Sequence, residues 1–128
     1  MRMYIRADLH IHGPYSRGTS KQISVPNLER YARLKGVDIL GTGDFTHPAW
    51  LRHLQENLEE REGLLYTSTG FPFLLSTELS SIYSQDGRVR KIHQVVLAPS
   101  FEVVEHIREE LSKHGRLDYD GRPIFGLS

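Results

Sequence analysis

Two histidines near the start of the chain are the residues best suited to chemistry. His10 and His12 are two residues apart, in a run over residues 4–12 that ends at a Gly-Pro pair. Because side chains alternate between the faces of a β-strand, a strand here places both imidazoles on one face, together with Asp8. Two such imidazoles can bind one metal ion, since neutral imidazole is a common metal ligand. The alternative is that the pair only ends a strand, and the motif alone leaves both interpretations open.

Further ligand-type side chains follow later apolar runs. Asp44 and Glu78 each end such a run, His47 follows shortly after Asp44, and His93 lies near the start of another run. In parallel α/β folds, ligands collect at the carboxyl ends of the strands, so we expect these side chains to meet the histidine pair. The donor set suits divalent ions such as zinc, manganese, iron or magnesium. A carboxylate between imidazoles can also bridge two ions that activate water against a phosphate ester.

Each of these residues has a structural alternative. Asp44 could instead cap the turn at Thr46. His93 could be a core or hairpin histidine with its polar atoms satisfied. Glu78 is harder to explain without a partner, because a lone acid at the end of an apolar strand is costly to desolvate.

Five basic residues are predicted to bind phosphate or DNA. Two lie in the first loop and three in a hairpin: Arg17, Lys21, Arg88, Arg90 and Lys91. The alternative for the hairpin residues is a charged face in water. The sequence contains no Gly-rich phosphate loop, serine-based nucleophile motif or dinucleotide fingerprint.

Composition limits the protein class. With 128 residues, 38% hydrophobic and 25% charged, the chain predicts one ordinary globular domain over residues 1–128. Sixteen basic and sixteen acidic residues leave no net charge, so a polyanionic partner is not indicated globally. The absence of cysteine excludes disulfides and sulfur-ligated zinc, and it fits a reducing cytoplasm. No apolar run is long enough for a membrane span, and the first residues do not resemble a signal peptide.

Strand-like and helix-like segments alternate along the chain. The predicted helices cover residues 27–35, 49–60 and 101–113, with Ser24, Thr46 and Ser100 as their N-caps and Gly36 ending the first of them. The predicted strands cover residues 4–12, 37–44, 73–78 and 92–98. A hairpin over 80–91 is predicted from the segments 80–83 and 88–91 with Asp86-Gly87 at its turn, and a further strand starts at 124–127. This alternation predicts an α/β fold with a parallel sheet or barrel. Because the pattern stops at the start of a strand, we expect part of a longer α/β barrel.

Several short motifs resemble a known superfamily. They are Asp-Leu-His-Ile-His at 8–12, Tyr-Ser at 15–16, Thr-Gly-Asp at 42–44, and Glu78. Together they resemble the PHP superfamily of metal-dependent phosphoesterases, which includes histidinol phosphatases and domains attached to bacterial DNA polymerases. The resemblance implies a distorted seven-stranded (β/α)7 barrel with up to three metal ions at the strand ends.

Three longer stretches, at residues 12–17, 41–48 and 121–124, are most similar to the endonuclease Q family within that superfamily. This resemblance implies a DNA-repair nuclease that nicks DNA beside deaminated bases such as uracil and hypoxanthine, and at abasic sites. It also implies that hydroxide held by the metal ions, rather than a side chain, attacks the phosphodiester.

The resemblance implies roles for the ligand-type residues. The pair His10 and His12 would bind one ion with Glu78. Glu78 would bridge to a second ion held by His93. Asp44, with or without His47, would hold a further ion or orient a ligand.

Two departures from the common PHP pattern affect this assignment. Arg17 stands where many members have an acid or a histidine, and Phe45 stands where they have a histidine. The later ligands of the superfamily have no counterpart after His93. We therefore expect the chain to be the amino-terminal part of the enzyme, with further ligands beyond Ser128.

The sequence favours a metal-dependent DNA endonuclease as the function of the full-length parent, with damaged DNA as its partner. A small-molecule phosphatase of the histidinol-phosphatase kind is the first alternative, and the neutral net charge is compatible with it. A non-catalytic PHP fragment is the second. Metal identity and oligomeric state are left open.

Overall fold

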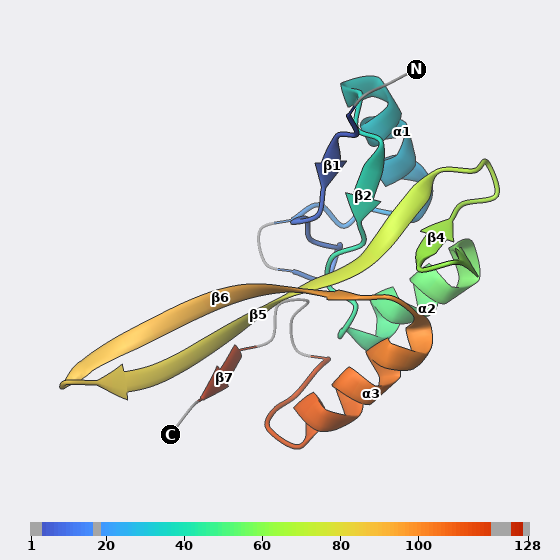
Figure 1. The fold of residues 1–128 in the computed structure, drawn as a ribbon. Helices are drawn as coiled ribbons and strands as arrows, with labels where there is room; N and C mark the ends of the chain where they lie inside the picture. Colours follow the sequence, from blue (N-terminus) through green and yellow to red (C-terminus); the bar gives the residue numbers. More distant parts are fainter. Residues whose placement is uncertain (1–3, 17–18, 119–123, 127–128) are drawn as a thin grey trace.

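The computed structural model describes residues 4–16, 19–118 and 124–126, and within these residues it is a mixed α/β fold (Figure 1). The helices are α1 (Val25–Lys35), α2 (Pro48–Asn57) and α3 (Phe101–Ser112). The strands are β1 (Ala7–Asp8), β2 (Ile39–Gly41), β3 (Glu59–Arg61), β4 (Leu64–Tyr66), β5 (Pro72–Gln85), β6 (Arg88–Ala98) and β7 (Ile124–Gly126). The predicted α/β class is therefore confirmed.

Strand β5 connects the two parts of the sheet. Its first residues pair with β2 in parallel and with β4 in antiparallel orientation, giving the order β1-β2-β5-β4-β3. Its later residues pair antiparallel with β6 and parallel with β7. The sheet is thus mixed rather than purely parallel, and the strands of the described residues form an open path. A closed barrel remains an expectation.

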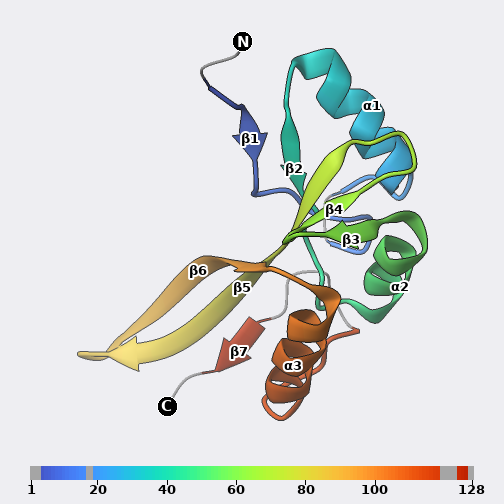
Figure 2. The same cartoon turned by 45° about the vertical axis from the view of Figure 1, so that its right-hand side comes forward.

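The ends of β5 and β6 form a long hairpin that projects from the rest of the molecule (Figure 2). We call residues 79–98 the arm. Its turn, Asp86-Gly87, has φ angles of 52° and 74°, as the predicted Asp-Gly hairpin requires. The hairpin is confirmed, although the predicted separate segments 73–78 and 80–83 are one continuous strand.

Most helix boundaries follow from their caps. The Ser24 hydroxyl accepts a hydrogen bond from the Asn27 N–H at 3.3 Å, and Gly36 ends α1 at a φ of 73°. Ser100 likewise accepts from the Val103 N–H at 3.2 Å. These caps are as predicted.

Helix α2 differs from the prediction at both ends. Its N-cap is His47 rather than Thr46, because the His47 Nδ1 accepts from the Ala49 N–H at 3.2 Å. It ends at Asn57 rather than near residue 60, because Leu58 is extended and residues 59–66 form the β3–β4 hairpin. Buried Leu65 pairs with Phe73 across β4 and β5, so sheet pairing replaces the last turn of the predicted helix.

The first two strands are shorter than predicted. Strand β1 pairs with β2 only through Ala7↔Ile39 and Asp8↔Leu40. After β2, Gly43 and Asp44 have φ angles of 64° and 51°, which turn the chain out of the strand direction. The histidine pair consequently lies in the segment after β1 rather than inside the strand.

The core lies between the sheet and the helices. Its fully buried side chains come from β2, β4, β5, β6 and all three helices, and they include Leu40, Leu65, Phe73, Leu75, Ala98, Val25, Ala32, Trp50, Leu54 and Val104. No helix among the described residues combines the length and the apolar character that crossing a membrane requires.

Candidate metal centre

Glycines let the segment after β2 contact the segment that carries the histidine pair. A Cβ atom added at Gly41 would lie 2.6 Å from the Leu9 carbonyl oxygen, and one added at Gly43 would clash with the Ile11 carbonyl oxygen. The Trp50 indole N–H donates to the carbonyl oxygens of Thr42 and Gly43 at 3.1 and 2.9 Å. Glycine and the indole together therefore fix the backbone that supports the site.

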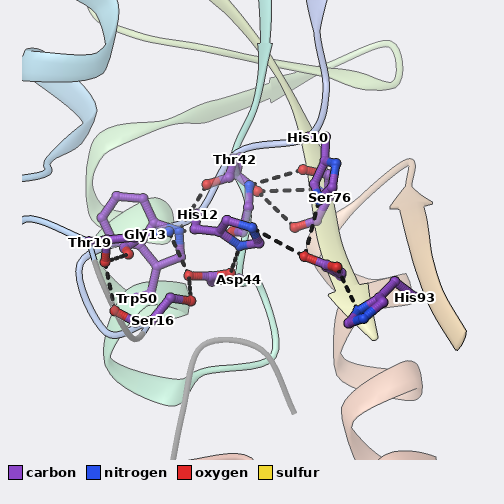
Figure 3. Close-up of polar contacts among 12 residues, drawn as sticks. His10, His12, Gly13, Ser16, Thr19, Thr42, Asp44, Trp50, Ser76 and His93 are labelled. Carbon is purple, nitrogen blue, oxygen red and sulfur yellow. Dashed lines mark hydrogen bonds and ion pairs between the residues drawn. The ribbon is translucent and has the colours of Figure 1, made fainter. Parts of the chain in front are cut away.

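The histidine pair and Glu78 converge on one point. Figure 3 shows His10, His12 and His93 with their polar contacts around this point. The Nε2 atoms of His10 and His12 lie 3.0 and 3.1 Å from the same carboxylate oxygen, Oε2 of Glu78. One ligand atom from each of the three residues lies within 4.8 Å of the others. Residues 68 positions apart in the sequence thus form a three-ligand group.

His93 contacts the other oxygen of the same carboxylate. Its Nδ1 lies 3.0 Å from Oε1 of Glu78 and 2.9 Å from the Ser80 hydroxyl. The Glu78 carboxylate therefore stands between the histidine pair and His93, which is the position that a bridging carboxylate needs.

The three-ligand group fits a metal ion in its donor types and spacing. Ligand atoms at 2.0–2.2 Å from one tetrahedral ion are about 3.4 Å apart, close to the 3.0 and 3.1 Å observed. Burial by itself would raise the pKa of Glu78, but the hydrogen bond from His10 and the charges of His10, His12 and His93 lower that pKa below its ordinary value. Glu78 is consequently ionised at neutral pH, as a metal ligand must be.

Asp44 contacts His12 but is not a member of the three-ligand group. It is fully buried, and its Oδ2 accepts from the Gly13 N–H at 2.5 Å and from the Ser16 hydroxyl at 2.7 Å. Its Oδ1 lies 3.3 Å from the His12 Nδ1. A carboxylate on Nδ1 favours the tautomer that leaves the Nε2 lone pair available, so Asp44 can orient His12 as a ligand.

The centre is open to solvent on one side. The His10 and His93 side chains are 56% and 51% exposed, whereas the Glu78 side chain is 9% exposed. The carboxylate is therefore anchored inside the fold, and the imidazoles face the side from which a substrate can approach.

Other predicted site residues lie elsewhere. His47 caps α2, and its ring stacks on Tyr15 with centroids 4.2 Å apart. Asp8 accepts a hydrogen bond from the His10 backbone N–H at 3.3 Å. Lys21 is exposed in the first loop, and Arg17 lies outside the described residues. The three hairpin residues are exposed on β6, beyond His93 toward the tip of the arm.

Some contributors to the site were not predicted. Ser80 holds His93, and Ser16 holds Asp44. Ser16 belongs to the Tyr-Ser motif at residues 15–16, so its position was a usable signal in the sequence. Ser80 carries no such signal, because only the strand register of β5 and β6 places it opposite His93.

Comparison with known proteins finds a similar architecture in two solved structures of endonucleases. No family model matches the chain. The lesion-specific endonuclease PfuEndoQ from Pyrococcus furiosus has a similar structure, with a TM-score of 0.82 and 28% sequence identity over 97% of this chain. An endonuclease Q in complex with a 27-mer duplex carrying an abasic lesion gives a TM-score of 0.81, also at 28% identity over 97% of this chain.

A curated relative extends the sequence similarity. An uncharacterised protein of Methanocaldococcus jannaschii is 37% identical over 122 residues, which cover 94% of this chain. The chain spans 30% of each solved endonuclease chain and 13% of the curated relative. Membership of the PHP superfamily and the roles of the individual site residues remain predictions.

Proposed function

We propose that this chain forms the metal-binding part of a DNA endonuclease that acts in DNA repair. The observation that carries the proposal is the convergence of His10, His12 and Glu78 on one point, with His93 on the second oxygen of the same carboxylate. The structural similarity to a lesion-specific endonuclease over almost the whole chain supports DNA as the substrate class.

In this proposal the chain's own residues have separate tasks. His10, His12 and Glu78 would hold one divalent ion, and His93 with Glu78 would hold another. Asp44 orients the imidazole of His12 through its Nδ1. Bound divalent ions at such a site activate water and neutralise charge on a phosphodiester. The exposed imidazoles leave that side open for a DNA backbone.

The proposed substrates are DNA strands that carry a deaminated base or an abasic site. One of the similar endonucleases is described as lesion-specific, and the other is bound to a duplex with an abasic lesion at its active site. Similarity over almost the whole of this chain supports lesion DNA, rather than a small phosphomonoester, as the compound to test first.

The test is cleavage of labelled duplexes that contain uracil, hypoxanthine, an abasic site or no lesion, with a small phosphomonoester assayed in parallel. We expect a nick near the lesion that requires a divalent cation and disappears with EDTA. The His10→Ala/His12→Ala variant should not cleave, whereas a variant of the exposed helix residue His106, His106→Ala, should cleave like the wild type. Hydrolysis of the phosphomonoester without any DNA cleavage would instead identify a small-molecule phosphatase.

A further inference from the structure

The arm concentrates positive charge in a chain that is neutral as a whole. Residues 79–98 contain three arginine or lysine residues, Arg88, Arg90 and Lys91, and a single acid, Asp86, whereas the whole chain has sixteen of each sign. The arm also projects from the body of the molecule in both views (Figures 1 and 2). A projecting basic hairpin suits contact with a polyanion.

The strand register separates these three basic residues by face. In the antiparallel β5–β6 ladder, His93 is paired with Ser80 and Lys91 with Ile82, without interruption. Because side chains alternate along a strand, Lys91 lies on the same face as His93, which contacts Glu78. Arg88 and Arg90 lie on the opposite face.

Position along the strand places Lys91 next to the metal centre. Two residues of an antiparallel strand span about 7 Å, so Lys91 is one same-face step beyond His93. Lys91 is exposed, and it has no ion-pair partner among residues 4–16 and 19–118. Its ammonium group is therefore available to an anion that lies across this face.

We propose that Lys91 binds a phosphate of the DNA backbone next to the phosphodiester at the metal centre. The proposal rests on the DNA substrate of the proposed function. Each DNA strand carries one phosphate per 3.4 Å of helix axis, so a step of about 7 Å corresponds to a phosphate one or two nucleotides away. A lysine ammonium binds such a phosphate as a compact point charge.

The strand register distinguishes basic residues that are equivalent in the sequence. Arg90 is the immediate neighbour of Lys91 and has the same charge, but it faces away from the metal centre. Contact with the cleaved strand therefore requires Lys91 more than Arg90. A backbone contact of this kind adds affinity and fixes the register of the DNA without reading its sequence.

The test is the equilibrium affinity of the metal-loaded protein for a fluorescent duplex with one abasic site, measured at several salt concentrations. We expect Lys91→Ala to weaken binding about threefold to tenfold and to lower the slope of log affinity against log salt by about 1. Arg90→Ala should have a smaller effect on both. Lys35→Ala, at the exposed end of α1, controls for loss of a surface charge.

Equal losses in the Lys91 and Arg90 variants, or no loss in the Lys91 variant, would overturn the inference. The proposed function is judged separately, by whether the wild type nicks DNA. If the wild type binds the duplex without nicking it, the proposed nuclease function is contradicted. The Lys91 and Arg90 variants then still show which face of the arm contacts the DNA. A wild-type protein that does not bind the duplex overturns the Lys91 contact as well.

Discussion

The backbone around Asp44 and the arm both contribute to the candidate metal centre, through His12 and His93, but they are built in opposite ways. Around Asp44 the chain is tightly packed: Gly43 touches the Ile11 carbonyl, and the carboxylate is fully buried under three polar contacts. Among the described residues of the arm, β7 pairs with β5 only along residues 80–82, the tip consists of β5 and β6 alone, and Val89 is 75% exposed. The backbone around Asp44 therefore has no space for an added side-chain atom, whereas a substitution near the tip of the arm removes few contacts.

This difference matches what each region has to do. Metal ligands must be held within a few tenths of an ångström, and buried supporting hydrogen bonds supply that precision. A phosphate contact by a lysine tolerates movement, because charge acts over several ångströms. Residue Glu78 joins the two regions, since it lies on β5 where the packed sheet continues into the arm.

The largest expected effect is on stability, and it differs between two glycines of similar backbone conformation. Gly43 and Gly87 have φ angles of 64° and 74°, but an added Cβ clashes with the Ile11 carbonyl only at Gly43. We expect Gly43→Ala to lower the free energy of unfolding by about 2–5 kcal/mol, from strain together with overpacking. Gly87→Ala should cost about 1–2 kcal/mol, from strain alone. Urea unfolding followed by circular dichroism measures both, and equal costs would contradict the contrast between the regions.

The next effect concerns metal affinity rather than folding. Asp44→Asn keeps the size of the side chain, but its amide can donate to the His12 Nδ1 and favour the tautomer that blocks Nε2. We expect affinity for a divalent ion to fall about tenfold to a hundredfold. Ser16→Ala removes one hydrogen bond to Asp44 and leaves the contact with His12, so a smaller loss is expected. Competition with a metal-sensitive dye measures both variants. An unchanged metal affinity of Asp44→Asn would show that metal binding does not require the contact between the Asp44 carboxylate and the His12 Nδ1.

The smallest effect lies at the edge of the packed region, on α1. Partial burial would raise the pKa of Glu29, but hydrogen bonds from Thr69, Thr67 and Arg33 and the charge of Arg33 lower it below its ordinary value of 4.5. A carboxyl group with a lowered folded-state pKa stabilises the protein above its unfolded-state pKa, and this contribution is lost as the pH falls through the folded-state value.

Glu29→Gln should therefore lower the free energy of unfolding by less than about 1 kcal/mol at pH 6, since exposed ion pairs contribute little. The difference between variant and wild type should shrink as the pH falls from about 4.5 toward 3. Unfolding by urea at pH 6 and pH 3 measures it. If the stability difference between Glu29→Gln and the wild type instead grew on acidification, the pKa of Glu29 would not be lowered in the folded protein.

Local signals in the sequence predicted much of the fold. Ser24, Gly36 and Ser100 define helix ends through their own side chains or backbone conformation, and the Asp-Gly pair defines the hairpin turn. These features depend on neighbouring residues, so they can be recognised without the tertiary structure.

The β3–β4 hairpin and the short first strands could not be predicted in the same way. The apolar stripe of α2 passes into Leu58 without a break, and only the pairing of Leu65 with Phe73 shows that the chain has become a strand. Likewise, β1 ends early because Gly43 and Asp44 turn away, which is a property of the partner strand.

The site shows the same division. His10, His12 and Glu78 could be proposed as a group because each ends or follows an apolar run. The role of Asp44 under His12 and the face on which Lys91 lies depend on contacts and register that the sequence does not show.

The central claim, that His10, His12 and Glu78 form a metal centre, is tested most directly by calorimetric titration of Zn²⁺ or Mn²⁺ into metal-free protein. We expect saturable binding by the wild type and by the surface variant His106→Ala. We expect that binding to be lost in His10→Ala/His12→Ala and in Glu78→Gln, with circular dichroism showing that all variants are folded. Equal binding by the wild type and by the folded ligand variants would mean that these three residues do not form a metal centre.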